Sequence, residues 1–194
     1  MGPVFYLHIQ KYVVNQLKSM KFRYNLTFVL LCHLAAAQTQ KITMLLNDAV
    51  VLENKIRAKE LIVLDSLGNE QAKIVMAELK VVKPFSIKND TLNYTTQHPL
   101  DEGDGYCIIE QKAALKDIKK VLKDRAMYFV TSENKVQITT AKKYDNGNTN
   151  NSKESADTFS TYIENVQNNE AFARALQKFF KKSGYVINID YWYD

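Results

Sequence analysis

The chain has 194 residues, with 26 Lys and Arg against 21 Asp and Glu, which gives a formal net charge of +5. Residues 1–37 hold four of the basic residues and none of the acidic ones, so residues 38–194 carry 22 basic and 21 acidic residues. This near balance gives no electrostatic reason to bind nucleic acid, and we expect no nucleic-acid partner. The 157 residues from position 38 onward are enough for one domain with a substantial core, or for two very small domains.

The stretch from Met20 to Gln40 has the pattern of a secretory signal peptide. Lys21 and Arg23 precede a mainly apolar run, Leu26–Leu34, and three alanines follow at 35–37. A positive start, a short apolar segment and small residues before the cut are the three parts of such a signal. A membrane span needs about 20 apolar residues, and this run is much shorter.

We therefore predict an upstream extension at residues 1–19 and a signal peptide at residues 20–37, with cleavage after Ala37. The mature protein is then secreted or periplasmic, with no stable membrane span of its own. Cys32 would leave with the signal, which makes Cys107 the one cysteine of the mature chain. A single cysteine cannot form an internal disulfide, so the stability of the fold must come from its core.

Residues 38–105 form a predicted β-rich N-terminal half. Apolar and polar residues alternate in short runs that are separated by turn-forming Asn, Asp and Gly. This alternation favours strands joined in hairpins. The predicted elements are a weak helix at 48–59, strands at 61–64 and 71–83, strands at 85–88 and 92–95 with a tight turn at 89–91, and a dividing loop at 97–105.

Residues 106–194 form a predicted C-terminal half with the order α-β-β-β-α-β. Leu115, Ile118 and Val121 have the spacing of an apolar helical stripe. The predicted elements are a helix at 111–126, strands at 127–132 and 135–140, a polar loop at 144–156, a strand at 158–166, a helix from the N-cap Asn168 to the αL cap Gly184, and a strand at 185–194. We predict an α+β fold, with a mostly antiparallel sheet covered on one face by two amphipathic helices. Whether the two halves form one domain stays open.

The first of these helices would carry a row of lysines on one face. They are Lys112, Lys116, Lys119, Lys120 and Lys123. Such a face suits an anionic lipid, glycan or acidic partner, although most faces of this kind are simply solvated.

Residues that could carry chemistry are few. His98 is the one histidine of the mature chain, so no cluster of His and Cys can hold zinc, and no glycine-rich phosphate loop or serine elbow is present. We expect no metal and no cofactor. The segment HPLDEGDGYC, from His98 to Cys107, combines an imidazole, a thiol and three acids. A small secreted hydrolase or thiol enzyme using Cys107 and His98 is therefore one alternative, and a buried structural thiol is the interpretation we favour.

The C-terminal tail is the candidate binding site. It contains Tyr191, Trp192 and Tyr193, and Trp192 is the single tryptophan. Flat aromatic faces at a surface commonly bind sugars or partner proteins, although alternating tyrosines on a last strand also suit a sheet packed under helices. Our first hypothesis is a non-enzymatic, secreted or periplasmic domain that binds a protein or a cell-envelope glycan. A structural subunit of a cell-envelope assembly is a further alternative.

Overall fold

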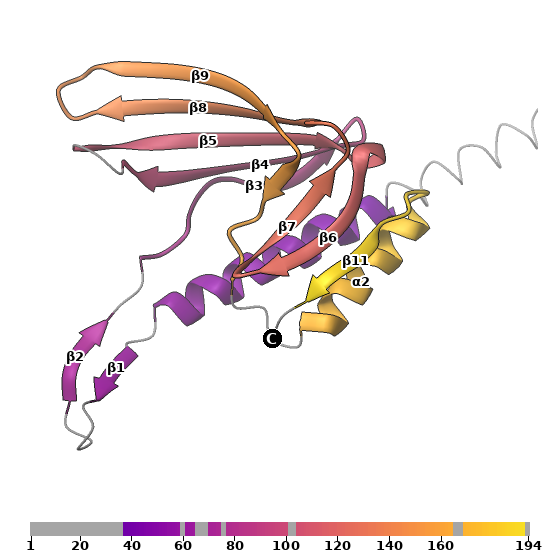
Figure 1. Ribbon diagram of the computed structural model, residues 1–194, viewed down its shortest axis with the longest axis horizontal. Helices are drawn as coiled ribbons and strands as arrows, with labels where there is room; N and C mark the ends of the chain where they lie inside the picture. Colours follow the sequence, from indigo (N-terminus) through magenta and orange to yellow (C-terminus); the bar gives the residue numbers. More distant parts are fainter. Residues whose placement is uncertain are drawn as a thin grey trace, which may run out of the picture.

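The computed structural model describes residues 37–58, 61–64, 70–74, 77–100, 104–164 and 169–192. These residues form an α+β fold with a mostly antiparallel arrangement of strands, as the sequence predicts (Figure 1). The two helices of the described chain are the N-terminal helix at residues 37–57 and α2 (Asn169–Lys182). The predicted signal peptide lies outside the described residues except for Ala37, which is helical.

A five-stranded antiparallel sheet is the largest element of the fold. Its order is β3 (Lys80–Lys88), β4 (Thr91–Pro99), β5 (Gly105–Ala114), β8 (Val136–Tyr144) and β9 (Thr149–Ala156). β4 and β5 lie on either side of the loop that we predicted as a divider, yet they pair along their length. Residues from both predicted halves therefore share one sheet.

A second sheet of four strands lies beside the first. Its order is β10 (Thr158–Ser160), β7 (Ala126–Thr131), β6 (Ile118–Asp124) and β11 (Asn188–Trp192), with β11 parallel to β6. The chain passes between the two sheets from β5 to β6 through a 3-10 turn, from β7 to β8, and from β9 to β10. Strands that change sheets at bends form corners, which join the two sheets into one folded surface.

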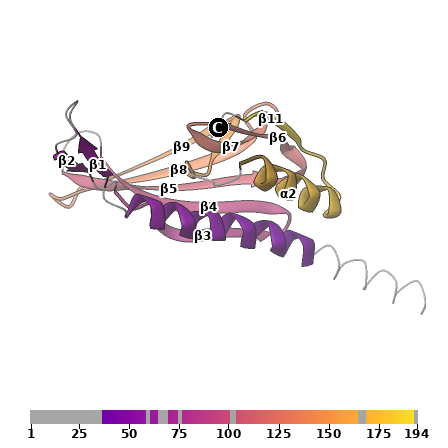
Figure 2. The same cartoon turned by 90° about the horizontal axis from the view of Figure 1, so that it is seen from below.

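The core lies between these sheets and the helices. The N-terminal helix places Ile42, Leu46, Ala49 and Val50 on one buried stripe. Figures 1 and 2 show both helices and the four-stranded sheet on the same side of the five-stranded sheet. The core residues contributed by the sheets and by α2 include Phe85, Leu92, Tyr94, Leu115, Ile118, Val121, Phe129, Val136, Phe159, Ala173, Leu176 and Phe180.

The predicted helix at 111–126 is wrong. These residues form the end of β5, a 3-10 turn at Leu115–Asp117 and β6. Leu115, Ile118 and Val121 do share the core, but their spacing of three has another origin. A 3-10 turn aligns residues three apart, and the register of β6 shifts between Ile118 and Lys120. The turn and the shift together imitate a helical stripe, and the lysine row predicted on that helix does not exist.

The predicted polar loop at 144–156 is also wrong. It is a hairpin in which β9 pairs with β8 from Val136–Ala156 to Lys143–Thr149. β9 is the edge of its sheet, and seven of its eight residues are exposed. An edge strand with both faces in water needs no apolar residues, so low hydrophobicity did not exclude a strand here.

Several predictions with local signals are confirmed. β1 (Leu61–Leu64) pairs with β2 (Glu70–Ile74), and β3 pairs with β4 around Asn89 and Asp90, which both have positive φ. α2 ends at Lys182 and is followed by the predicted cap Gly184 with φ 88°, after which Tyr185 N donates to Phe180 O. The predicted strand at 71–83 is divided, since β2 ends at Ile74 and β3 begins at Lys80.

The remaining elements match the sequence predictions in part. The predicted strands at 127–132 and 135–140 correspond to β7 and β8, which lie in different sheets. β10 covers only the start of the predicted strand at 158–166, and β11 begins at Asn188 rather than Tyr185. Asn168, the predicted N-cap, lies outside the described residues.

Candidate functional site

One face of the five-stranded sheet points away from both helices and from the second sheet (Figures 1 and 2). Side chains alternate between the two faces of a strand. On β4, Leu92 and Tyr94 are buried in the core, so Asn93 between them points to the opposite side. On β5, Gln111 is buried and Lys112 points away in the same manner. We call this second side of the sheet the outer face.

The strand register sets the side chains of the outer face in two complete rows. Each row crosses all five strands, and neighbouring strands lie about 4.8 Å apart. The first row is Lys83, Thr95, Glu110, Thr139 and Lys153, and the second is Ser86, Asn93, Lys112, Gln137 and Ser155. All ten side chains are polar or charged.

The outer face carries a positive charge around a single central acid. Glu110 accepts from Lys112 Nζ at 2.7 Å and from Lys83 Nζ at 3.4 Å. The hydrogen bond from Lys112 is the main reason that the pKa of Glu110 lies below its ordinary value, and burial opposes it. One carboxylate thus faces two ammonium groups. Among the described residues, no acid forms an ion pair with Lys153 at the far end of the row.

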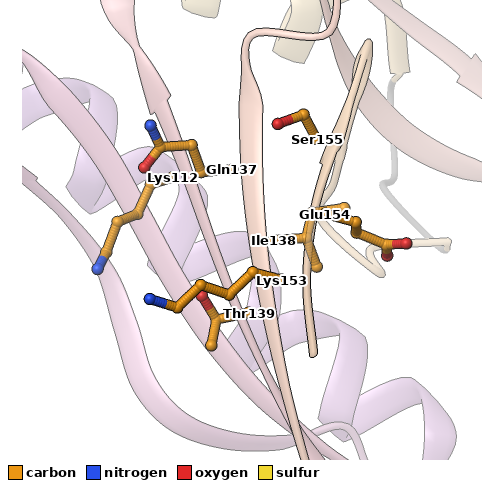
Figure 3. Close-up of a pocket in the computed structure, with 7 residues that line it drawn as sticks. All are labelled: Lys112, Gln137, Ile138, Thr139, Lys153, Glu154 and Ser155. Atoms are coloured by element: carbon orange, nitrogen blue, oxygen red, sulfur yellow. The ribbon is translucent and has the colours of Figure 1, made fainter. Parts of the chain in front are cut away.

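A groove of about 420 Å³ lies over β5, β8 and β9 on this face. Figure 3 shows Lys112, Gln137, Thr139 and Lys153 on one side of the strands, with Glu154 pointing away from them. A second hollow of about 430 Å³ shares Lys112, Gln137 and Ser155 with the groove and continues to the ends of the strands. Pockets for apolar cofactors are lined mainly by hydrophobic and aromatic side chains. Apart from Ile138, the residues that line the groove are polar or charged, so the groove suits a hydrated, hydroxyl-rich or charged ligand.

His98 and Cys107, the residues of the enzyme alternative, are direct partners in the register of β4 and β5. The structure therefore brings them together, as that alternative requires. The hydrogen bond of His98, however, joins its Nε2 to Thr96 Oγ1 at 2.8 Å, and its ring lies 4.5 Å from that of Tyr162. Burial, followed by the charge of Arg57, lowers the pKa of His98.

The described residues around this pair supply only part of a catalytic site. Asp104 is the one described acid of the three in the HPLDEGDGYC segment. A hollow of about 380 Å³ beside His98 is lined by Gln97, Pro99, Gly105, Tyr106 and other residues, but Cys107 is not among them. A thiol nucleophile needs access to its substrate and a base within hydrogen-bonding distance. In the described part of the chain, His98 lines this hollow and Cys107 does not, and Cys107 is half-buried rather than fully buried as we expected.

The predicted aromatic site lies at the end of the second sheet. The backbone of Trp192 pairs with Lys123, and on the same two strands, β6 and β11, Lys120 Nζ lies 2.7 Å from Asp190 Oδ2. The side chains of Tyr191 and Trp192, and all of Tyr193, lie outside the described residues. Binding through these three residues therefore stays a prediction.

Comparison with known proteins gives no functional assignment. No protein-family model matches the chain, and neither a curated protein nor a solved structure is significantly similar to it. Within the described residues, no group of three or more His, Cys, Asp or Glu is placed to hold a metal ion. No helix in the described part of the chain is long and apolar enough to cross a membrane.

Proposed function

We propose that the chain is a secreted or periplasmic, non-enzymatic binding module whose outer face holds an extended, sparsely anionic glycan of the cell envelope. The location follows from the signal peptide predicted at residues 20–37. The observation that carries the binding proposal is the pair of polar rows across all five strands, open to solvent along the groove over β5, β8 and β9.

The side chains of these rows match the chemistry of an acidic sugar. Hydroxyl and amide groups, such as those of Thr139, Gln137 and Asn93, both donate and accept hydrogen bonds, as sugar hydroxyls do. Lys112 and Lys153 offer ammonium donors for carboxylates. A groove that is partly open to solvent does not have to enclose its ligand, so it can accept a chain longer than itself.

Two other classes of partner fit the outer face less well. The centre of a protein–protein interface is usually rich in aromatic and apolar anchors, and the two rows contain none. Nucleic acid carries a negatively charged phosphate at every nucleotide. Glu110 lies in the middle of the first row, where its carboxylate would repel these phosphates. A polymer with spaced carboxylates can place its charges on the lysines and its hydroxyls beside Glu110.

The neighbouring His98 and Cys107 favour a thiol enzyme as the second candidate function. Its test is labelling of the native protein with a thiol-reactive probe, followed by mass measurement. Rapid, pH-dependent modification of Cys107 that is slowed by His98→Gln would support this candidate. Slow modification that His98→Gln does not change would remove it.

Binding of fluorescently labelled oligogalacturonate to the purified exported protein tests the proposal. We expect the pair Lys112→Glu and Lys153→Glu to raise the dissociation constant at least about tenfold, since each charged hydrogen bond is worth roughly 1.5 kcal/mol or more. The control pair is Lys119→Glu and Lys142→Glu, which makes the same charge change at exposed sites on β6 and on the opposite face of β8. Equal weakening by both pairs, or no binding by the unmodified protein, would contradict the proposal.

A further inference from the structure

The two edges of the five-stranded sheet differ in whether their outward backbone N–H and C=O groups have hydrogen-bond partners. At the β3 edge, the side chain of Asn47 exchanges two hydrogen bonds with the backbone of Phe85, at 2.9 and 3.1 Å. Asn54, two helical turns on, does the same with Leu79, directly before β3. Pro84 and two irregularities in register further interrupt this edge. The N-terminal helix thus closes the β3 edge against another strand.

The β9 edge has none of these features. β9 contains no Pro or Gly, and its eight residues pair with β8 in unbroken register. Its outer backbone groups have no strand beside them in the described chain. A long, regular edge strand with free donors and acceptors is a ready template for pairing with a further strand.

We propose that β9 pairs antiparallel with β9 of a second copy of this chain, across a two-fold axis at Ser152. The two five-stranded sheets then become one continuous sheet of ten strands. A closed dimer formed by the same surface on both copies is the commonest form of homo-oligomer.

The sequence of β9 selects this register. A two-fold axis perpendicular to the sheet places one residue opposite its own copy. With Ser152 at the axis, Lys153 faces Asn151 of the second copy, Glu154 faces Asn150, and residues 149–155 are all paired. With Lys153 at the axis, two lysines would oppose each other, which is unfavourable. With Asn151 at the axis, only residues 149–153 would pair.

The dimer would place both outer faces on the same side of the joined sheet, because a two-fold axis perpendicular to a sheet preserves its sides. Two copies of the groove would then be presented together. A repeating polymer that contacts both copies gains from the high effective concentration of the second site. The pairing itself rests on the edge of β9 and does not depend on the proposed glycan.

Sedimentation analysis of the purified exported protein over a range of concentrations tests the pairing without any ligand. We expect a reversible monomer–dimer equilibrium. Asn151→Lys would place two lysines opposite each other at two symmetric positions, and we expect it to weaken the dimer about fivefold or more. Asn151→Glu would place Glu opposite Lys153 twice, and should strengthen the dimer by a similar factor. Asn151 is exposed, so neither change disturbs the monomer core.

A cross-link gives a second readout of the same register. In a Cys107→Ser background, Ser152→Cys should form a disulfide between two copies under a mild oxidant, because residues directly opposite in antiparallel strands have Cβ atoms within about 5.5 Å. Glu133→Cys, at the exposed corner after β7, should form far less. A protein that stays monomeric at every concentration and forms no Ser152→Cys cross-link would overturn the proposal. A dimer that responds equally to Asn151→Lys and Asn151→Glu would overturn it too.

Discussion

The side chain of Gln111 pairs with the backbone of Ser160 as a neighbouring strand would. Gln111 Nε2 donates to Ser160 O at 2.8 Å, and Ser160 N donates to Gln111 Oε1 at 2.9 Å. Gln111 lies on the core side of β5 and is 2% exposed, while Ser160 ends β10 in the other sheet. This one amide therefore connects the two sheets where they are folded against each other.

Gln111→Ala should lower the free energy of unfolding by about 2–4 kcal/mol, because a donor and an acceptor of Ser160 both lose their partner inside the protein. Gln137→Ala is the matched control, since Gln137 is exposed on the outer face and should change stability by less than about 0.5 kcal/mol. Urea denaturation followed by circular dichroism measures both. Equal effects of the two variants would show that the Gln111 link contributes nothing.

Two Glu–Arg ion pairs with the same helical spacing should contribute very differently to the free energy of unfolding. Glu53 is 0% exposed, and it bonds Arg57 Nε at 2.7 Å and the backbone N of Glu164 at 3.0 Å. Glu53→Ala leaves Arg57 and that N–H without this partner, and should cost about 3 kcal/mol. Glu170 pairs with Arg174 on the exposed surface of α2, with side chains 66% and 69% exposed. Glu170→Ala should cost less than about 1 kcal/mol by the same denaturation measurement.

Two glycines with positive φ offer a test of a close backbone approach. A Cβ on Gly105 would lie 2.2 Å from Lys143 O, whereas a Cβ on Gly147 would meet no atom within 4 Å. Gly147→Ala should cost about 1–2 kcal/mol from backbone strain alone. Gly105→Ala should cost clearly more, because β5 and β8 must also separate at this point. Thermal unfolding that gave the same loss for both variants would contradict the close approach.

The stability of the protein should fall on mild acidification because of His98. Burial and the charge of Arg57 lower its pKa below the ordinary 6.5, so the folded protein binds fewer protons than the unfolded chain as the pH drops. The stability that the protein gains from keeping His98 neutral is complete above about pH 6.5. It is lost as the pH falls through the lowered pKa of His98 in the folded state. His98→Gln should flatten the dependence of the free energy of unfolding on pH below about 6.5. An unchanged slope in that variant would assign the effect to other groups.

The elements that the sequence predicts correctly depend on neighbouring residues. The cap of α2 is set by Gly184, which follows its last lysines, and the turn before β4 is set by Asn89 and Asp90. Each of these signals determines only the structure of residues next to it in the sequence. The outer face depends instead on register, which brings Lys83, Glu110 and Lys153 into one row from three separate strands. No local pattern contains that information. The register shift after Ile118 also gave β6 the apolar spacing of a helix. The sequence therefore predicted Lys112 on a helix rather than on the outer face of β5.

The most direct test of the outer face is an amide NMR titration of the exported, isotope-labelled protein with oligogalacturonate. We predict that the largest chemical-shift changes fall on β5, β8 and β9, at Lys112, Gln137, Thr139, Lys153 and Ser155. Amides of α2 and β11 should change little, and the shifts should shrink at high salt, as expected for screened charges. Changes concentrated at Tyr191, Trp192 and Tyr193 would move the site to the aromatic tail. No changes at saturating ligand would contradict glycan binding by this protein.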